Sequence, residues 1–213
     1  MNIIILGPQG SGKGTQAKLL ASKLGLFRAE AGNLIREEAK KDKRINEIIN
    51  KQGKLIPHEE AFSIITKYVE ENDPDLRNFI LDGYPRSIRQ YELLKGWLED
   101  KNLKIDKVIL LNTSEKESVR RLSARRICEK CGTVYNLITN PPPKGGCRCG
   151  GELTQREDDR PEAIRKRLNE YKKQTMPVID LFKKDRILMK VNGERPVEVI
   201  FKDILGRLGA KND

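Results

Sequence analysis

Short apolar runs alternate with longer amphipathic stretches along this chain of 213 residues. The apolar runs predict buried strands at residues 3–6, 79–81, 108–111 and 187–191. Residues 16–24 are typical of the stretches between them, because Leu19, Leu20 and Leu24 lie on one helical face. Strands that alternate with helices predict a parallel sheet that is covered by helices on both faces.

Several single positions refine this pattern. Gly25 follows the first helical stretch and is a residue type that commonly ends a helix. Residues 87–98 predict another helix, with Trp97 in the core. Met176 and Pro177 indicate an interruption in a later helix, whose apolar face continues through residues 178–182. His58, the one histidine of the chain, is expected in a loop, so catalysis by histidine is disfavoured.

One segment departs from the alternation. Residues 127–155 lose the helical period and contain all four cysteines, three consecutive prolines and several glycines. A segment of ~30 residues buries too little apolar surface to fold without a further constraint. We therefore expect a compact insert that is stabilised through its cysteines.

The composition is that of a globular protein, with 37% hydrophobic and 34% charged residues. No apolar run approaches the roughly 20 residues of a membrane span, and Met1 leads directly into a strand. We therefore expect no signal peptide and a cytoplasmic protein. The net charge of +11 raises the question of nucleic-acid binding. Many basic residues stand beside acidic ones, as in residues 156–160, which indicates a solvated surface; a site for two polyphosphates would also carry excess positive charge.

A glycine-rich segment, residues 7–15, lies between the first predicted strand and the helix after it. There the backbone N–H groups and the helix N-terminus can bind phosphate, and Lys13 adds a positive charge. The spacing matches the P-loop pattern G-x4-G-K, except that Gly14 stands before Thr15. A glycine-rich turn without a ligand would not account for four glycines and a lysine in nine residues. The segment therefore predicts nucleotide binding.

The cysteines form two close pairs, Cys128 with Cys131 and Cys147 with Cys149, separated by fifteen residues. This layout is typical of a tetrahedral four-cysteine zinc site, which would be structural because it has no open coordination position. Such a site would stabilise the insert by on the order of 10 kcal/mol. Disulfides and a redox-active dithiol are the alternatives, disfavoured by the cytosolic character and by the lack of a βαβ setting. The second pair is one residue shorter than C-x2-C, so whether both its cysteines bind zinc stays open.

Asp82 lies just beyond the second predicted strand and is followed by Gly83 and Tyr84. An acid at the carboxyl end of a strand beside a P-loop can orient the water molecules around a bound Mg²⁺. Hydrolytic P-loop enzymes often place a glutamate directly after this acid to activate water, and no such base follows here. The pattern therefore favours phosphoryl transfer to an acceptor over hydrolysis.

Together these motifs resemble the adenylate kinase family, in its form with a long zinc-bearing lid, over essentially the whole chain. The glycine-rich segment matches G-x-x-G-x-G-K-G-T, which accounts for Gly14, and residues 82–86 match D-G-[FY]-P-R. The arginines at positions 121, 125 and 126 are similar to the start of that family's lid. Residues 156–159 together with residues 165–167 are similar to its end.

The resemblance implies an α/β fold: a P-loop nucleoside triphosphate hydrolase-like parallel sheet with helices on both faces, a helical monophosphate-binding insert and a small zinc-bearing lid insert. The expected divisions are residues 1–29, 60–120 and 160–213 for the core nucleotide-binding domain, 30–59 for the AMP-binding insert and 121–159 for the lid. The implied reaction is reversible, Mg²⁺-dependent phosphoryl transfer from ATP to AMP giving two ADP, with lid closure excluding water. Family members are mostly monomers and some archaeal ones are trimers, and the sequence does not decide between these states.

The resemblance also implies a role for each matching residue. The implied ATP-binding residues are Gly10, Ser11, Gly12, Lys13, Gly14, Thr15, Arg121, Arg125, Val134, Tyr135 and Arg195. The implied AMP-binding residues are Ala31, Arg36, Lys54, Leu55, Ile56, Gly83, Tyr84, Pro85, Arg86, Gln90, Arg156 and Arg167. Thr15 and Asp82 would serve Mg²⁺ through water, and the implied catalytic residues are Lys13, Arg86, Arg125, Arg156 and Arg167. Arginine suits this chemistry because guanidinium groups stay charged and hold phosphates bidentately.

The chain departs from the family's pattern on the acceptor side. The family usually has Thr-Gly-Asp before the AMP-site arginine, whereas this chain has Ala31, Gly32 and Asn33. The missing hydroxyl weakens the case for strict AMP selectivity, although Gln90 is retained. A kinase for another nucleoside monophosphate, or one with relaxed nucleoside triphosphate choice, is therefore an alternative. A zinc-ribbon nucleic-acid-binding protein is a more remote one, suggested by the positive charge but lacking interleaved aromatic residues.

Overall fold

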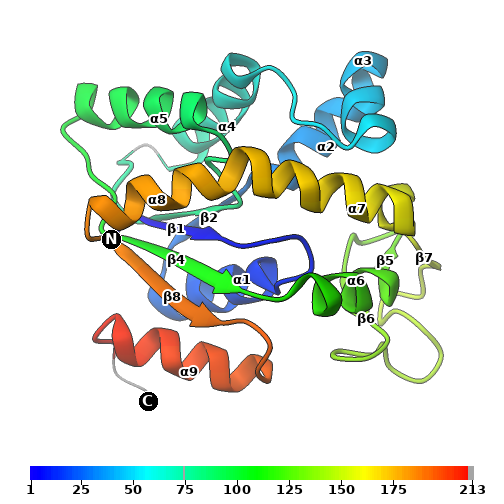
Figure 1. Cartoon of the computed structure of the whole chain (residues 1–213). Coiled ribbons are helices and arrows are strands. Elements are labelled where there is room, and N and C mark those ends of the chain that lie inside the picture. The colour runs from blue at the N-terminus through cyan, green and yellow to red at the C-terminus, as the bar shows by residue number, and fades with distance from the viewer. Residues whose placement is uncertain (74, 211–213) are drawn as a thin grey trace.

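The computed structural model describes residues 1–73 and 75–210, and its centre is a parallel β-sheet (Figure 1). Within those residues the sheet has five strands in the order β2–β3–β1–β4–β8. Their bounds are Ile3–Leu6 for β1, Phe27–Glu30 for β2, Phe79–Asp82 for β3, Lys107–Asn112 for β4 and Leu188–Asn192 for β8. All four predicted strands are thus confirmed. The central strand is β1, in which every residue is buried and Ile4 pairs with Leu81 on one side and Val108 on the other.

The apolar pattern does not reveal β2, the strand at one edge of the sheet. Its sequence is Phe-Arg-Ala-Glu, and Ala29 is its single fully buried residue. An edge strand has one hydrogen-bonded neighbour and is less enclosed than a central one, so it needs no continuous apolar run. This strand nevertheless places Arg28 and Glu30 beside the carboxyl end of β3.

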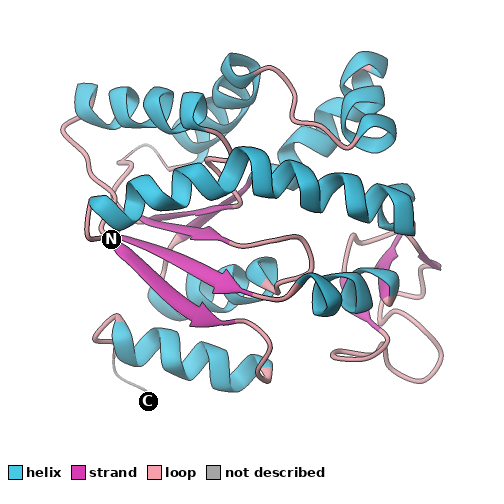
Figure 2. Ribbon diagram, viewed as in Figure 1, coloured by secondary structure: helices cyan, strands magenta, loops and turns pink. Residues whose placement is uncertain are grey.

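Helices cover both faces of the sheet, as predicted (Figure 2). Alternate residues of β1 supply the two faces, Ile3 and Ile5 on one and Ile4 and Leu6 on the other. The first face packs against α1 (Lys13–Leu24) and α9 (Val197–Arg207). The second packs against α4 (His58–Asn72), α5 (Ile88–Asp100) and α8 (Met176–Lys184).

The helix-end predictions have mixed outcomes. Gly25 ends α1 in the left-handed conformation, with φ of 64°, as predicted. The helix predicted at 87–98 is α5, and Trp97 is half-buried at the edge of the core, where its Nε1 donates to Glu70 at 2.9 Å. The prediction for His58 was wrong. It is the first residue of α4, and its Nδ1 lies 3.3 Å from the hydroxyl of Ser87, which caps α5.

The interruption indicated by Met176 and Pro177 takes the form of a π-helical turn, Tyr171–Thr175. It joins α7 (Pro161–Glu170) to α8 without a break in the helical path (Figure 1). Pro177 lies in the first turn of α8, where a missing N–H and the proline ring are tolerated. The extra residue of a π turn shifts which side chains face the core.

Two smaller units extend from the sheet. Helices α2 (Ala31–Lys41) and α3 (Lys43–Asn46) and a π turn (Glu47–Gln52) enclose an apolar cluster that includes Ile45 and reaches Ala61 of α4. The boundary expected at residue 60 therefore falls inside α4. The second unit follows α6 (Glu115–Ser123) and is an antiparallel sheet in the order β6–β5–β7. The strand bounds are Arg125–Cys128 for β5, Val134–Asn136 for β6 and Leu153–Thr154 for β7.

The boundary expected at residue 121 likewise falls inside a helix, α6, whereas the one at residue 160 directly precedes α7. None of the helices in the described part of the chain combines the length and the apolar character that a membrane crossing needs.

Candidate active site

A cavity of about 1140 Å³ opens at the carboxyl ends of β1, β2 and β3. Its walls come from the P-loop, from α2 and the loop before α4, and from the lid and α7. Among the residues predicted to bind nucleotides or Mg²⁺, all line this cavity except Pro85. The predicted ATP-side and AMP-side residues, far apart in sequence, therefore share one cavity.

The P-loop conformation requires its glycines. Gly10 and Gly12 have φ of 82° and 87°, a region that side chains disfavour. A Cβ on Gly10 would lie 2.9 Å from the carbonyl oxygen of Ser118, and one on Gly7 would lie 2.7 Å from that of Leu111. Ser11 is fully buried, and its hydroxyl has no partner among the described residues. The loop is thus packed tightly on its outer side, while residues 10–15 line the cavity.

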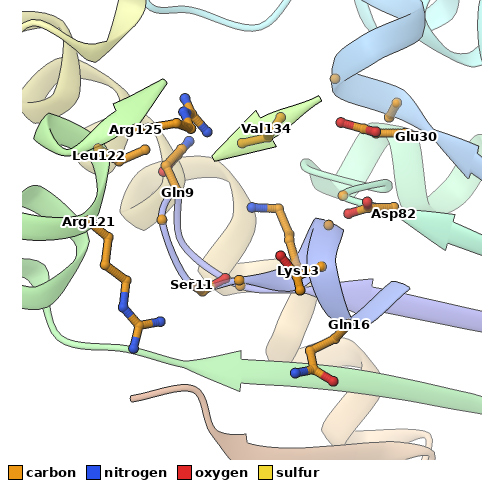
Figure 3. Close-up of a pocket in the computed structure, with 18 of the residues that line it drawn as sticks. Gln9, Ser11, Lys13, Gln16, Glu30, Asp82, Arg121, Leu122, Arg125 and Val134 are labelled. Atoms are coloured by element: carbon orange, nitrogen blue, oxygen red, sulfur yellow. The ribbon is translucent and has the colours of Figure 1, made fainter. Parts of the chain in front are cut away.

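Lys13 extends from the start of α1 into the cavity (Figure 3). Asp82 and Glu30 lie on one side of it in that view, and Gln9 and Arg125 on the other. Its Nζ donates to the carbonyl of Pro8 at 3.3 Å. Burial lowers the pKa of Lys13 to about 7; the attraction of Asp82 opposes this shift and nearby arginines add to it. An ammonium group in this setting gains much from an anion that binds beside it.

Arginines from five separate segments line the same cavity as Lys13. They are Arg36 of α2, Arg86 after β3, Arg125 of β5, Arg156 before the 3₁₀ turn Glu157–Asp159, and Arg167 of α7. Burial lowers the pKa of Arg36 to about 10 and that of Arg156 to about 9, and it lowers those of Arg86 and Arg167 in the same direction. The predicted catalytic arginines are therefore brought together in a desolvated, strongly positive region.

Two acids hold the lid-side arginines in place. Asp159 is fully buried and accepts two hydrogen bonds from Arg125, at 2.7 and 2.5 Å. Arg167 lies 3.0 Å from Asp158 and 3.3 Å from Asp159. Although burial opposes it, the guanidinium groups, led by that of Arg167, keep the pKa of Asp158 below its ordinary value. These carboxylates orient the arginines and neutralise part of their charge.

The end of the cavity that is predicted to bind AMP is built around Arg86. Its backbone N–H donates to Gln90 Oε1 at 2.8 Å, its Nε donates to the carbonyl of Gly83 at 2.6 Å, and its own carbonyl accepts from Thr175 Oγ1 at 3.0 Å. Gly32 leaves room for the guanidinium groups, because a Cβ there would lie 3.4 Å from a terminal nitrogen of both Arg36 and Arg86. The two arginines thus converge on one point of the cavity wall.

The other end of the cavity has a different character. Arg121 donates to Glu117 at 2.6 Å and to the carbonyl of Gly193 at 2.7 Å, and it lies apart from Lys13 in Figure 3. Arg195 pairs with Asp203. Val134 and Tyr135 reach the cavity from strand β6.

The four cysteines meet in the lid, outside the main cavity apart from Cys131. They are free thiols, and their sulfur atoms all lie within 4.8 Å of one another. Cys128 and Cys149 are 3.4 Å apart, and Cys131 and Cys147 are 3.5 Å apart. The short Cys147–Cys149 pair therefore turns both sulfurs toward the first pair, which is the arrangement that a single metal ion requires.

Comparison with known proteins agrees with this geometry. The family model for adenylate kinase matches residues 5–187. An adenylate kinase of Archaeoglobus fulgidus is 42% identical over 210 residues, covering 96% of each chain. The adenylate kinases of Thermotoga maritima and Pyrococcus furiosus are 39% and 41% identical, over 97% and 96% of this chain and 96% and 94% of their own.

The chain belongs to the adenylate kinase family. It is therefore an enzyme of the nucleoside monophosphate kinase type, and the cavity between its P-loop and Arg86 is the candidate active site of that family's reaction. The zinc-ribbon nucleic-acid-binding alternative is set aside. Membership of the family accounts for the P-loop and for the arginines that line the cavity, which that alternative left unexplained.

Among the charged cavity residues of this adenylate kinase that sequence reasoning missed, Arg28 and Glu30 lie beside Asp82. Arg28 and Glu30 line the cavity, and Arg28 Nη2 lies 2.7 Å from both Asp82 and Glu30. Burial raises the pKa of Asp82 in spite of the attraction of Arg28. Their spacing of two residues would have placed them on one face of a strand, but that signal is useful only once β2 is recognised as a strand.

The charge of Lys13 generates a prediction about pH. In the free enzyme the pKa of Lys13 is about 7 rather than 10.5. Bound phosphates favour the ammonium form of Lys13, so ATP binding raises this pKa. Above pH 7, Lys13 must therefore take up a proton when ATP binds. ATP affinity should therefore fall as the pH rises from 7 to 9.

The titration of Lys13 can be followed by NMR of enzyme labelled at the lysine Cε, with Lys13→Arg used to assign the signal. We expect a midpoint near 7 in the free enzyme and a higher one with a non-hydrolysable ATP analogue. A free-enzyme midpoint at the ordinary value would contradict the prediction.

Proposed function

We propose that this enzyme catalyses reversible transfer of the γ-phosphoryl group of MgATP to AMP, giving two ADP. The observation that carries the proposal is the single cavity with a P-loop on one side and the converging Arg36 and Arg86 on the other. Phosphoryl transfer demands that donor and acceptor phosphates meet in line and that the charge of the moving group be neutralised. Lys13 and the arginines between the two ends supply that charge.

On the donor side, residues 10–15 would hold the ATP phosphates through backbone N–H groups, and Lys13 would bridge toward the transferred group. Arg121, Val134, Tyr135 and Arg195 would border the ATP base. On the acceptor side, Arg36 and Arg86 would clamp the AMP phosphate, and Gln90, Ala31 and residues 54–56 would border its base. Residues 83–85 would form the turn that carries Arg86.

The transferred group would be stabilised by Arg125, Arg156 and Arg167. Arg125 comes from β5 of the lid, Arg156 from the segment that leaves the lid, and Arg167 from α7. The three guanidinium groups would therefore reach the phosphates together only when the lid is closed. We take residues 121–159 as this lid and residues 30–59 as the AMP-binding insert. Closure of the lid over the cavity would exclude water, which otherwise competes with AMP as the acceptor.

Mg²⁺ fits the residues at the P-loop. A threonine hydroxyl and a buried carboxylate, those of Thr15 and Asp82, are oxygen donors of the kind that this ion contacts directly or through water. When bound with ATP, the ion supplies neutralisation of charge on the β- and γ-phosphates. Thr15 and Asp82 would orient it, and no carboxylate base follows Asp82 to activate water for hydrolysis.

Zinc fits the four cysteines. Tetrahedral coordination with Zn–S bonds of about 2.3 Å places sulfurs roughly 3.8 Å apart, and the Cys128–Cys149 and Cys131–Cys147 separations are 3.4 and 3.5 Å. We propose that Cys128, Cys131, Cys147 and Cys149 hold one structural zinc ion. The ion would keep the short strands β5 to β7 together, so that the lid moves as a unit.

A relaxed choice of acceptor is a second candidate, and Ala31 favours it. Ala31 is buried and lines the cavity on the proposed AMP side. It offers a methyl group at the position where the family pattern has the hydroxyl of a threonine. Recognition of adenine would then rest mainly on Gln90, whose Oε1 already accepts a hydrogen bond from the backbone of Arg86.

The proposed reaction predicts a large effect at Arg86. Replacing it with alanine should lower kcat/KM for AMP by about 100- to 1000-fold, since a desolvated charged donor to phosphate is lost. Arg89→Ala is the matched control, because Arg89 is exposed and pairs with Glu59 outside the cavity. A coupled assay for ADP formation measures both, with melting temperatures to check folding. Near-normal turnover of Arg86→Ala would count against the proposal.

Acceptor choice is tested by scanning AMP, CMP, UMP and GMP with the wild-type enzyme and two variants at position 31. AMP should have the highest kcat/KM. Ala31→Thr should raise the preference for AMP over the others by roughly 3- to 10-fold, the value of one added hydrogen bond. Ala31→Val, which has the same shape without the hydroxyl, should not. A wild-type enzyme that prefers another acceptor would identify that acceptor as the substrate.

Zinc binding predicts about one zinc ion per chain by elemental analysis of enzyme purified without chelators. Chelation should lower the temperature at which the lid unfolds but leave most of the helical circular dichroism, because the main sheet has its own core. Adding zinc back should restore the transition. Identical calorimetric traces before and after chelation would show that the cysteines hold no structural metal.

A further inference from the structure

Arg28 joins two carboxylates at the edge of the active site. One of its terminal nitrogens, Nη2, donates to Asp82 Oδ2 and to Glu30 Oε2, each at 2.7 Å. The three residues come from the ends of neighbouring strands, because Glu30 is the register partner of Asp82 and Arg28 precedes Glu30 by two residues. A single guanidinium nitrogen therefore links the acid assigned to Mg²⁺ with a second acid.

The position of Arg28 is enclosed. Its side chain is 23% exposed and that of Asp82 is 3% exposed. A Cβ on Gly14 would lie 3.4 Å from Arg28 Nη2 and 3.5 Å from Asp82 Oδ2, so the pair lies against the first turn of α1. The Nε of Arg28 is buried and has no hydrogen-bond partner among the described residues. The guanidinium group is thus held chiefly by the carboxylates of Asp82 and Glu30.

Without a cation between them, these two carboxylates would be a donor set for a divalent metal. Carboxylate oxygens are the ligands that Mg²⁺ and Mn²⁺ prefer. The buried carboxylate of Asp82 and the partly exposed one of Glu30, both bound to one guanidinium nitrogen, repel each other unless a positive charge is shared. Arg28 supplies that charge permanently, and arginine cannot lose its proton to make way for a metal. The guanidinium group therefore stands where a metal ion would otherwise be attracted.

We propose that Arg28 is a positioning residue that takes the place of a metal ion between Asp82 and Glu30, so that Mg²⁺ enters the site only together with nucleotide phosphates. This inference rests on the proposed role of Asp82 toward Mg²⁺. Arg28 contacts Asp82 through Oδ2 alone, so the other oxygen is left to orient the water shell of a phosphate-bound ion. A metal bound in advance between the two acids would be held away from the ATP phosphates.

Binding of Mn²⁺, followed by electron paramagnetic resonance in the absence of nucleotide, tests the proposal without measuring activity. The wild-type enzyme should bind Mn²⁺ weakly. Arg28→Gln should bind one Mn²⁺ at least about fivefold more tightly, because Asp82 and Glu30 lose the cation that they share. Adding Glu30→Gln to this variant should abolish the gain. Arg28→Lys keeps the charge and should behave as the wild-type enzyme does.

Arg89→Gln removes the same charge from an exposed position and is the matched control. The proposal is overturned if Arg28→Gln binds Mn²⁺ no more tightly than Arg89→Gln, or if the wild-type enzyme binds it as tightly as Arg28→Gln. If the neutral variant does not fold, tight nucleotide-free Mn²⁺ binding by Arg28→Lys or by the wild-type enzyme overturns it equally.

Asp82→Asn separates this inference from the proposed function. In the presence of a non-hydrolysable ATP analogue, Asp82→Asn should weaken Mn²⁺ binding. If it does so while Arg28→Gln gains no nucleotide-free site, only the role of Arg28 fails. If Asp82→Asn has no effect on the nucleotide complex, the role of Asp82 toward Mg²⁺ fails and the role of Arg28 fails with it.

Discussion

The structure depends on holding positive charge in a desolvated cavity before any substrate is present. Burial lowers the pKa of Lys13 and of four of the arginines around it, which means that water no longer stabilises these cations fully. Like charges in such a setting also repel one another. Glu30, Asp82 and Asp158 in the cavity wall, and Asp159 buried behind it, offset part of this cost. The phosphates of two nucleotides carry the negative charge that is still lacking. The electrostatic repulsion within the free site therefore favours their binding.

A fold can carry such a site only if its stability comes from elsewhere. Here two separate apolar clusters sandwich β1, one on each face of the sheet, and neither includes a charged residue of the cavity. The charged groups lie at the carboxyl ends of the strands, where loops leave the sheet and the backbone is free to turn. Buried acids then fix individual arginines, as Asp159 fixes Arg125. The segment proposed as the lid packs around a small cluster of its own, which includes Cys128, Tyr135 and Cys147 and is separate from the main core.

Much of this organisation could be predicted from local pattern, and the exceptions have physical reasons. The strands in the middle of the sheet were recognisable because both of their faces must be apolar, whereas β2 at the edge carries Arg28 and Glu30 and shows no apolar run. His58 was misplaced although its neighbours indicate the start of a helix, since Pro57 precedes it and the acids Glu59 and Glu60 lie in the first turn. Met176 and Pro177 indicated an interruption of the helix, but no residue type identifies it as the π turn Tyr171–Thr175.

The sequence by itself determined the α/β class, the P-loop, the cysteine layout and the identity of the arginines, because glycine spacing, apolar runs and charge are local properties of the chain. Only the tertiary structure decided that these groups share one cavity, that Cys147 and Cys149 both face the first cysteine pair, and that Arg28 stands between Asp82 and Glu30. Electrostatic interactions act through space and depend on distance and burial. Neither quantity is fixed until the strands are paired and the lid is folded onto the core.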